Sequence, residues 1–211
     1  MKAQQTTDGS KSASAPHQYD LVVIGAGSGG VAAARRAAEY GAKVAIIEAE
    51  RLGGTCVNQG CVPKKVMWNA ANINASFEQF ADYGFKRPIK EGKLDDAEWT
   101  KESWPILKAH RDAYIKRLNG IYAGMLEKQG VDLYVGYGRF LSADSVAVFS
   151  KARSANESPT ATLTAKRFLI AAGGFPNSPD VPGAELGGTS DDFFNYEVQP
   201  KRAIIVGSGY I

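Results

Sequence analysis

The sequence predicts an α/β fold built around a parallel β-sheet, with long crossover helices and a small antiparallel β-meander. Three observations lead to this expectation: short β-branched runs typical of buried strands, an alanine-rich helical segment between the first two runs, and turn-separated strands further along. The chain has 211 residues, of which 44% are hydrophobic and 22% charged. This composition excludes disordered, collagen-like and disulfide-framework proteins.

A β-α-β unit opens the ordered part of the chain. We expect a strand over Asp20–Ile24, an alanine-rich helix over Val31–Tyr40 that stops at Gly41, and a second strand over Lys43–Ile47. The strand and the helix are joined by Gly25-Ala26-Gly27-Ser28-Gly29-Gly30. This order of strand, glycine-rich turn and helix is typical of a Rossmann-like dinucleotide-binding fold.

Each glycine of this fingerprint has a physical role. Gly25 allows the tight turn, Gly27 lets a pyrophosphate approach the backbone, and Gly30 lets the helix pack closely on the strand. Glu48 lies 18 residues after Gly30, close to the ~20 at which an acid accepts hydrogen bonds from an adenosine ribose. A carboxylate there repels a 2′-phosphate, so the site suits FAD or NAD. The alternative is a tight turn in an unrelated sheet, with Glu48 a surface acid.

The middle of the chain predicts two helices and four short strands. Helices are expected over Val66–Phe80 and from near Trp104 or Pro105 to Gln129. In the second helix the residues of an apolar stripe recur at three- and four-residue spacing, and they are Leu107, Arg111, Tyr114, Leu118, Ile121 and Met125. The strands, which we expect to form a meander that leads back to the parallel sheet, are Val131–Val135, Ser145–Phe149, Ala161–Ala165 and Phe168–Ala171.

Near its end the chain repeats the beginning of a glycine fingerprint. A buried strand is expected over Ala203–Val206, followed by Gly207, Gly209 and Tyr210. We therefore expect a disordered tail over 1–17, an incomplete nucleotide-binding domain over 18–199, and over 200–211 the first strand and turn of a second, truncated dinucleotide-binding domain.

The segment Cys56-Val57-Asn58-Gln59-Gly60-Cys61 is a second constellation. A disulfide that closes so short a loop removes little chain entropy, so stabilisation does not explain it. A structural zinc ion needs four ligands, and only His17 and His110 could supply imidazole, so no metal site is expected. Reversible redox chemistry fits best.

The residues after this pair favour a reactive thiolate. If a helix begins around Pro63, Cys61 lies at its positive end beside Lys64 and Lys65, and both effects stabilise a thiolate. A thiol pair that receives electrons from a nicotinamide needs a two-electron carrier between them. Flavin has that chemistry.

Together these residues resemble the pyridine nucleotide-disulfide oxidoreductase family. The resemblance is carried by Gly25–Gly30, Glu48, Gly53–Lys65 and Val66–Asn69, and it runs from Tyr19 to Ile211. It covers nearly all of this chain but roughly half of a family member. Pro63-Lys64-Lys65 is typical of the members that reduce glutathione disulfide, since lipoamide and mercuric reductases usually have Ser before the lysine.

The resemblance implies a catalytic cycle. NADPH reduces FAD, the flavin reduces a Cys56–Cys61 disulfide, and the dithiol reduces glutathione disulfide. Cys61 would be the thiolate that faces the flavin, Cys56 the thiol that attacks the substrate, and Lys64 the cation beside the flavin ring. The glutamate that pairs with this lysine, and the interface domain with its His-Glu pair, lie in family segments beyond residue 211.

The resemblance also implies the binding residues. FAD would contact Gly25, Gly27, Ser28, Gly29, Gly30, Glu48, Thr55, Cys56, Lys64 and the backbone of Gly138. Glutathione disulfide would contact Ser28, Arg35 and Tyr122, and NADPH would contact the partial motif Gly207, Gly209 and Tyr210. Arg35 suits an anionic substrate because its guanidinium matches a carboxylate.

Partners and location follow from family and composition. The full-length protein is expected to be a homodimer, and this chain alone to be inactive. The charge of +3 is dispersed, so no nucleic-acid partner is expected. No apolar run approaches the ~18 residues that span a bilayer. Residues 1–17 lack the apolar segment of a secretory signal and two cysteines make no secreted disulfide scaffold, so a cytoplasmic location is expected, with the mitochondrion as the alternative. Two other functions remain. One is a reductase of another disulfide such as trypanothione, because Met125 stands where many family members that reduce glutathione disulfide have asparagine. The other is a non-catalytic flavin-binding product.

Overall fold

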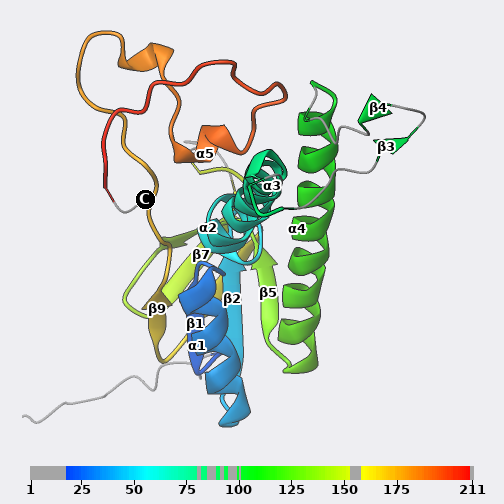
Figure 1. Ribbon diagram of the computed structural model, residues 1–211. Coiled ribbons are helices and arrows are strands. Elements are labelled where there is room, and N and C mark those ends of the chain that lie inside the picture. Colours follow the sequence, from blue (N-terminus) through cyan, green and yellow to red (C-terminus); the bar gives the residue numbers. More distant parts are fainter. Residues whose placement is uncertain are drawn as a thin grey trace, which may run out of the picture.

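A four-stranded parallel sheet forms the centre of the computed structural model, which describes residues 18–79, 82–84, 89–90, 93–94, 99, 101–152 and 158–209. Its strand order is β5-β2-β1-β9 (Figure 1), and all three neighbouring pairs are parallel. The strands are β1 Leu21–Ile24, β2 Val44–Glu48, β5 Asp132–Val135 and β9 Phe168–Ile170. The expected α/β class with a parallel sheet is thereby confirmed.

Helices and a second sheet surround this centre. The helices are α1 Ser28–Glu39, α2 Gly54–Gln59, α3 Cys61–Gln79, α4 Ser103–Lys128, the 3-10 turn η1 Ala184–Leu186 and α5 Ser190–Phe193. Two short strands, β3 Ile89–Lys90 and β4 Lys93–Leu94, pair antiparallel. The antiparallel sheet has the order β6-β7-β8 and consists of β6 Tyr137–Phe140, β7 Ser145–Phe149 and β8 Ala161–Thr164.

The core lies on both faces of the parallel sheet. In β2, Val44 and Ile46 pack with residues of α1 and α4, whereas Ala45 and Ile47 pack with residues of β7 and β8. All four side chains are at most 1% exposed. Because successive strand residues point to opposite faces, this continuous apolar run is what a sheet covered on both sides requires.

The segments that carry the two motifs meet at the carboxyl ends of the parallel strands. The glycine-rich turn follows β1, and the segment that leads to α2 follows β2. Figure 1 shows α2 and α3 beyond this end of the sheet. In open α/β sheets, ligands bind outside the carboxyl ends of the strands, so the fold places both motifs where a ligand is expected.

Two expected elements differ in the structure. The helix expected from Val31 begins at Ser28, because the N–H of Val31 already donates to the carbonyl of Gly27 at 3.0 Å. The strand expected over Val131–Val135 is not part of the meander but is β5, the parallel neighbour of β2. The strand β6 was not expected, and Gly136, with φ +145°, is the single residue that separates it from β5.

The helices around the cysteines also differ from expectation. The six-residue α2 was not expected, because a segment of that length shows no helical period, and α3 begins at Cys61 and not near Pro63 or Val66. The buried residues of α4 are Trp104, Arg111, Ile115 and Leu126. The expected apolar stripe included Ile121, which is exposed, although α4 contacts α1, α2, α3 and β5.

The expected strand over Ala203–Val206 is absent. These residues pair with no described strand, and Ile204 is 94% exposed. Residues 1–17, expected to be disordered, and Tyr210 lie outside the described residues. None of the helices in the described ranges is both long enough and apolar enough to cross a membrane.

Candidate functional site

The glycine-rich turn after β1 is fixed by hydrogen bonds from three directions. The N–H of Gly25 donates to the carbonyl of Ile47 at 2.8 Å, and the N–H of Ala26 donates to Glu48 Oε2 at 2.7 Å. The N–H of Gly53 donates to the carbonyl of Ala26 at 2.8 Å. We call Gly25–Gly30 the cradle. Its backbone is held by β2 and by the segment before α2.

Only glycine fits at the tightest points of the cradle. A Cβ on Gly25, which has φ +100°, would lie 2.3 Å from the carbonyl oxygen of Ala171. A Cβ on Gly30 would lie 1.9 Å from the carbonyl oxygen of Gly25. A Cβ on Gly54 would lie 2.7 Å from Cα of Gly27, so the cradle and the segment before Cys56 touch backbone to backbone.

The cradle has the donors that a dinucleotide needs. Gly27 is the N-cap of α1, no acidic residue occupies the first turn, and Ser28 and Gly29 are exposed. The first N–H groups of a helix and its dipole favour a phosphate. Glu48 accepts bonds from the N–H groups of Ala26 and Glu50 at 2.7 and 2.8 Å. A carboxylate offers about four acceptor positions, so Glu48 retains acceptors for ribose hydroxyls.

Cys56 and Cys61 lie together between two helices. Cys56 is a half-buried residue of α2 and Cys61 is the exposed first residue of α3, and both are free thiols in this structure. The pKa of Cys56 is raised, first by its hydrogen bond to the Cys61 thiol and then by burial. The backbone N–H of Cys61 and the side chain of Ser28 also bond to Cys56 and oppose this rise. Ser28, the first residue of α1, therefore contacts the thiol pair directly.

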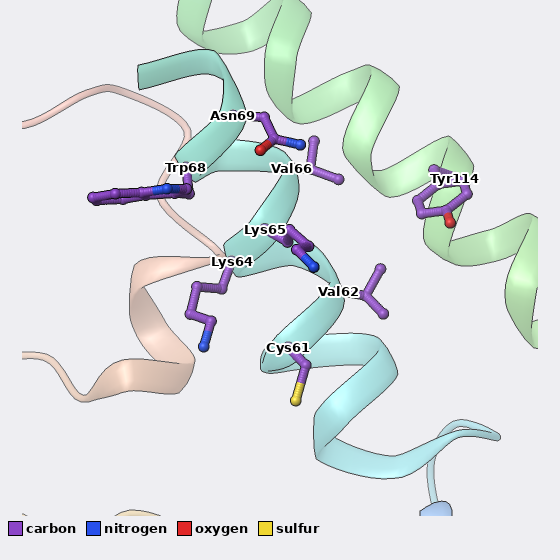
Figure 2. A pocket seen from close by; sticks show the side chains of 8 residues that line it. All are labelled: Cys61, Val62, Lys64, Lys65, Val66, Trp68, Asn69 and Tyr114. Carbon is purple, nitrogen blue, oxygen red and sulfur yellow. The ribbon is translucent and has the colours of Figure 1, made fainter. Parts of the chain in front are cut away.

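An open cavity of about 790 Å³ lies beside Cys61. Figure 2 shows the side chains of Cys61 and Lys64, one helical turn apart in α3, pointing toward the N-terminal end of that helix, with Val62 on the side of Tyr114 of α4. The lining residues are Cys61, Val62, Lys64, Lys65, Val66, Trp68, Asn69 and Tyr114. One thiol and two ammonium groups, those of Lys64 and Lys65, thus line one open, largely apolar space.

An asparagine pair ties the cysteine segment to α4. Asn119 Nδ2 donates to the carbonyl of Leu52 at 2.7 Å and to Asn58 Oδ1 at 3.0 Å. Asn58, 6% exposed, donates through Nδ2 to the carbonyls of Leu52 and Gly54 at 3.1 and 2.8 Å. The role of neither residue was predicted from the sequence. The one signal for Asn119 is a poor helix former in the interior of a long helix.

A buried arginine was also missed, because it occupied a position on the expected apolar stripe of α4. Arg111 is 2% exposed, pairs with Asp112 at 2.7 Å and donates to the carbonyl of Phe194 at 2.7 Å. Burial favours the neutral form of Asp112, but hydrogen bonds from Lys108 and Arg111 outweigh it and lower the pKa of this carboxyl. Arg111 therefore joins α4 to the segment around α5.

The expected substrate residues lie on two neighbouring helices, Ser28 and Arg35 on α1 and Tyr122 on α4. Arg35 Nε donates to Gln129 Oε1 at 2.6 Å, at the end of α4, and Tyr122 packs against the core between the sheet and the helices. Ser28 alone contacts the thiol pair. Thr55 is exposed in α2, next to Cys56.

The remaining expected binding residues lie on other elements. Gly138 lies on β6 opposite Val148, and a Cβ there would lie 3.4 Å from side-chain atoms of Ile24 and Ile47, so β6 passes close to β1 and β2. Gly207 and Gly209 are exposed, and a Cβ on either would meet no atom within 4 Å.

Comparison with known proteins identifies the family of the chain. Residues 19–211 match the family model described as "Pyridine nucleotide-disulphide oxidoreductase". Glutathione reductases from Yarrowia lipolytica and Schizosaccharomyces pombe are each 50% identical to the chain, over 94% and 92% of it. Glutathione reductase from Debaryomyces hansenii is 42% identical over 92% of the chain. The chain spans only 39–41% of the length of these relatives. The match over residues 19–211 shows that the chain belongs to the pyridine nucleotide-disulphide oxidoreductase family.

Proposed function

We propose that this chain is the FAD-binding and disulfide-carrying part of an NADPH-dependent reductase of glutathione disulfide. The observation that carries the proposal is the contact of Cys56 with both Cys61 and Ser28. Through it a thiol pair adjoins the cradle, whose exposed helix end suits a dinucleotide. Three curated relatives that share 42–50% identity with the chain are glutathione reductases, which supports the substrate.

FAD would supply two-electron transfer between a nicotinamide and sulfur. The cradle amides, with Ser28 and Gly29 at the start of α1, would bind its pyrophosphate, and Glu48 would accept hydrogen bonds from a ribose hydroxyl. Lys64 would place a positive charge beside the flavin ring. Thr55 and the backbone of Gly138 would complete the contacts, because each lies on an element adjacent to the cradle or to the carboxyl ends of β1 and β2.

The thiol chemistry follows from the two cysteines. Two electrons and two protons convert a Cys56–Cys61 disulfide into two thiols. Cys56, as thiolate, attacks one sulfur of glutathione disulfide and releases one glutathione thiolate, which takes up a proton. Cys61 then attacks the Cys56 sulfur of the mixed disulfide, releases the second glutathione and restores the internal disulfide. The raised pKa of Cys56 keeps this thiol protonated near neutral pH, so its attack requires a base. The family resemblance assigns that base to the interface domain of a partner subunit.

Substrate recognition and assembly extend the proposal. Arg35 uses Nε to bond Gln129, so its two terminal nitrogens are suited to a substrate carboxylate, with Ser28 and Tyr122 as further contacts. We assign 18–199 to the FAD-binding domain and 200–211, including Gly207, Gly209 and Tyr210, to the start of the NADPH-binding domain. The whole protein is proposed to be a homodimer in the cytoplasm, with the mitochondrion as the alternative location.

Steady-state kinetics of the full-length protein test this function. NADPH oxidation is followed with glutathione disulfide and with trypanothione disulfide in separate assays. The flavin absorbance of the purified protein is also recorded. We expect bound flavin, rapid turnover with glutathione disulfide and at least a ~100-fold lower kcat/KM with trypanothione disulfide. Faster turnover with trypanothione disulfide would identify that disulfide as the substrate. Bound flavin without turnover of either disulfide would favour a non-catalytic, flavin-binding role.

A matched pair of variants assigns that turnover to the cysteines. Cys56→Ser and Cys61→Ser each replace sulfur by oxygen with little change of shape. Both are expected to abolish glutathione disulfide reduction while bound flavin is retained. Turnover that survives either substitution would contradict the assigned chemistry.

A further inference from the structure

We propose that Asn119, on α4, is a positioning residue for the Cys56–Cys61 pair, because its side-chain amide fixes the segment that carries Cys56. This inference rests on the proposed function, in which the pair cycles between dithiol and disulfide. It concerns a residue 58 positions beyond Cys61 in the chain, outside the cysteine motif itself.

The hydrogen bonds around Asn119 form a closed triangle. Both N–H groups of its amide are used, one on the carbonyl of Leu52 at 2.7 Å and one on Asn58 Oδ1 at 3.0 Å. The Nδ2 group of Asn58 completes the triangle by donating to the same Leu52 carbonyl at 3.1 Å. The side chain of Asn119 on α4, the side chain of Asn58 on α2 and the carbonyl of Leu52 before α2 are therefore bonded to one another.

The hydrogen bonds of this triangle attach to the chain on both sides of Cys56. Leu52 precedes Cys56 by four residues, and Asn58 follows it by two. Asn58 also donates to the carbonyl of Gly54 at 2.8 Å, within the first turn of α2. A helix of six residues does not hold its own shape in water, so the position of α2 depends on such external bonds.

The thiol chemistry depends on this position. Cys56 contacts Cys61 across the junction of α2 and α3 and contacts Ser28 of the cradle. Hydrogen bonds weaken steeply when their geometry changes, and forming an internal disulfide depends on how often the two sulfurs meet. Loosening α2 lowers the effective concentration of one thiol at the other, so it destabilises the disulfide relative to the dithiol.

Removing the amide donor tests this inference in the full-length protein. Asn119→Asp keeps the size of the side chain and removes both donors, and Asn119→Ala removes them without adding charge. Asn72→Asp on exposed α3 is the matched control, since it makes the same chemical change away from the triangle. The dithiol–disulfide equilibrium of Cys56 and Cys61 is measured in dithiothreitol redox buffers by alkylation and mass spectrometry, and unfolding is measured in parallel.

We expect both Asn119 variants to shift the equilibrium constant at least ~10-fold toward the dithiol, a rise of about 30 mV in reduction potential, and Asn72→Asp to leave it unchanged. An unchanged constant in folded Asn119 variants would overturn the proposal. Loss of the fold in both variants would also overturn it, because Asn119 would then serve the fold and not the pair. A reversible disulfide in a protein that does not reduce glutathione disulfide would contradict the proposed function alone.

Discussion

Two segments of this chain share one local pattern and end in different structures. In each, an apolar run is followed by a glycine with positive φ: Gly25 at +100° and Gly207 at +109°. Before the first glycine, Val22 and Val23 are 0% exposed, whereas Ile205, two residues before the second, is 86% exposed. The backbone turn is therefore encoded locally, and the buried strand is not.

The difference lies in the neighbours of each turn. The first is bonded to β2 and to the segment before α2, and its strand lies between two parallel partners. The second pairs with no described strand, and a Cβ on Gly207 would meet nothing within 4 Å. The contacts that fix the first turn are therefore not found around the second turn in the described residues.

The largest effect is expected where the cradle is tightest. Gly30→Ala places a Cβ 1.9 Å from the carbonyl oxygen of Gly25, so we expect a loss of about 3 kcal/mol or more of unfolding free energy. Gly29→Ala is the matched control, because a Cβ there meets nothing within 4 Å and alanine favours a helix by roughly 0.5–1 kcal/mol. Urea unfolding of both variants checks this. Equal stabilities would contradict the close packing of α1 on the turn.

The two apolar runs give the next largest contrast. Val23→Ala removes fully buried methyl groups, and we expect a cost of about 2 kcal/mol. Ile205→Ala, at the matching position before the second glycine, is expected to change the unfolding free energy by less than about 0.5 kcal/mol. The comparison uses urea unfolding of the 211-residue chain. A cost at Ile205 as large as that at Val23 would show that the second run is packed as well.

The smallest effect concerns the serine within each turn. The side chain of Ser28 bonds to Cys56 and opposes the rise of its pKa. Ser28→Ala should therefore raise the pKa of Cys56 further, and the rate of Cys56 alkylation at pH 8 should fall because less thiolate is present. Ser208→Ala, in the second turn, should leave that rate unchanged. Fragment-resolved mass spectrometry distinguishes Cys56 from Cys61, and an unchanged rate in Ser28→Ala would contradict the contact.

The same raised pKa predicts a pH dependence of stability. The folded chain holds the Cys56 proton more tightly than the unfolded chain, whose cysteines titrate near ~8.5. The contribution of Cys56 is therefore complete below that pH and is lost as the pH rises through the folded pKa. Unfolding midpoints measured between about pH 7 and pH 10 should fall less in Cys56→Ser than in the unmodified chain.

The sequence predicts the elements whose pattern is long or carries a fixed signal. The β1-α1-β2 unit, the end of α1 shortly before Gly41 and the length of α4 follow from apolar periods and glycine positions. It did not predict α2, which is too short for a period, or the change of sheet at Gly136, where one glycine separates two strands. Asn119 and Arg111 could not be assigned either, because their roles depend on Leu52, Asn58 and Phe194, which only the tertiary fold brings near them.

Amide hydrogen exchange of the 211-residue chain, measured with and without FAD, tests the central contrast most directly. We predict slow exchange at Val22 and Val23 in both conditions, added protection of Gly27–Gly30 when FAD is present, and fast exchange at Ile204–Val206 throughout. Slow exchange at Ile204–Val206, or a cradle whose exchange FAD leaves unchanged, would contradict the account.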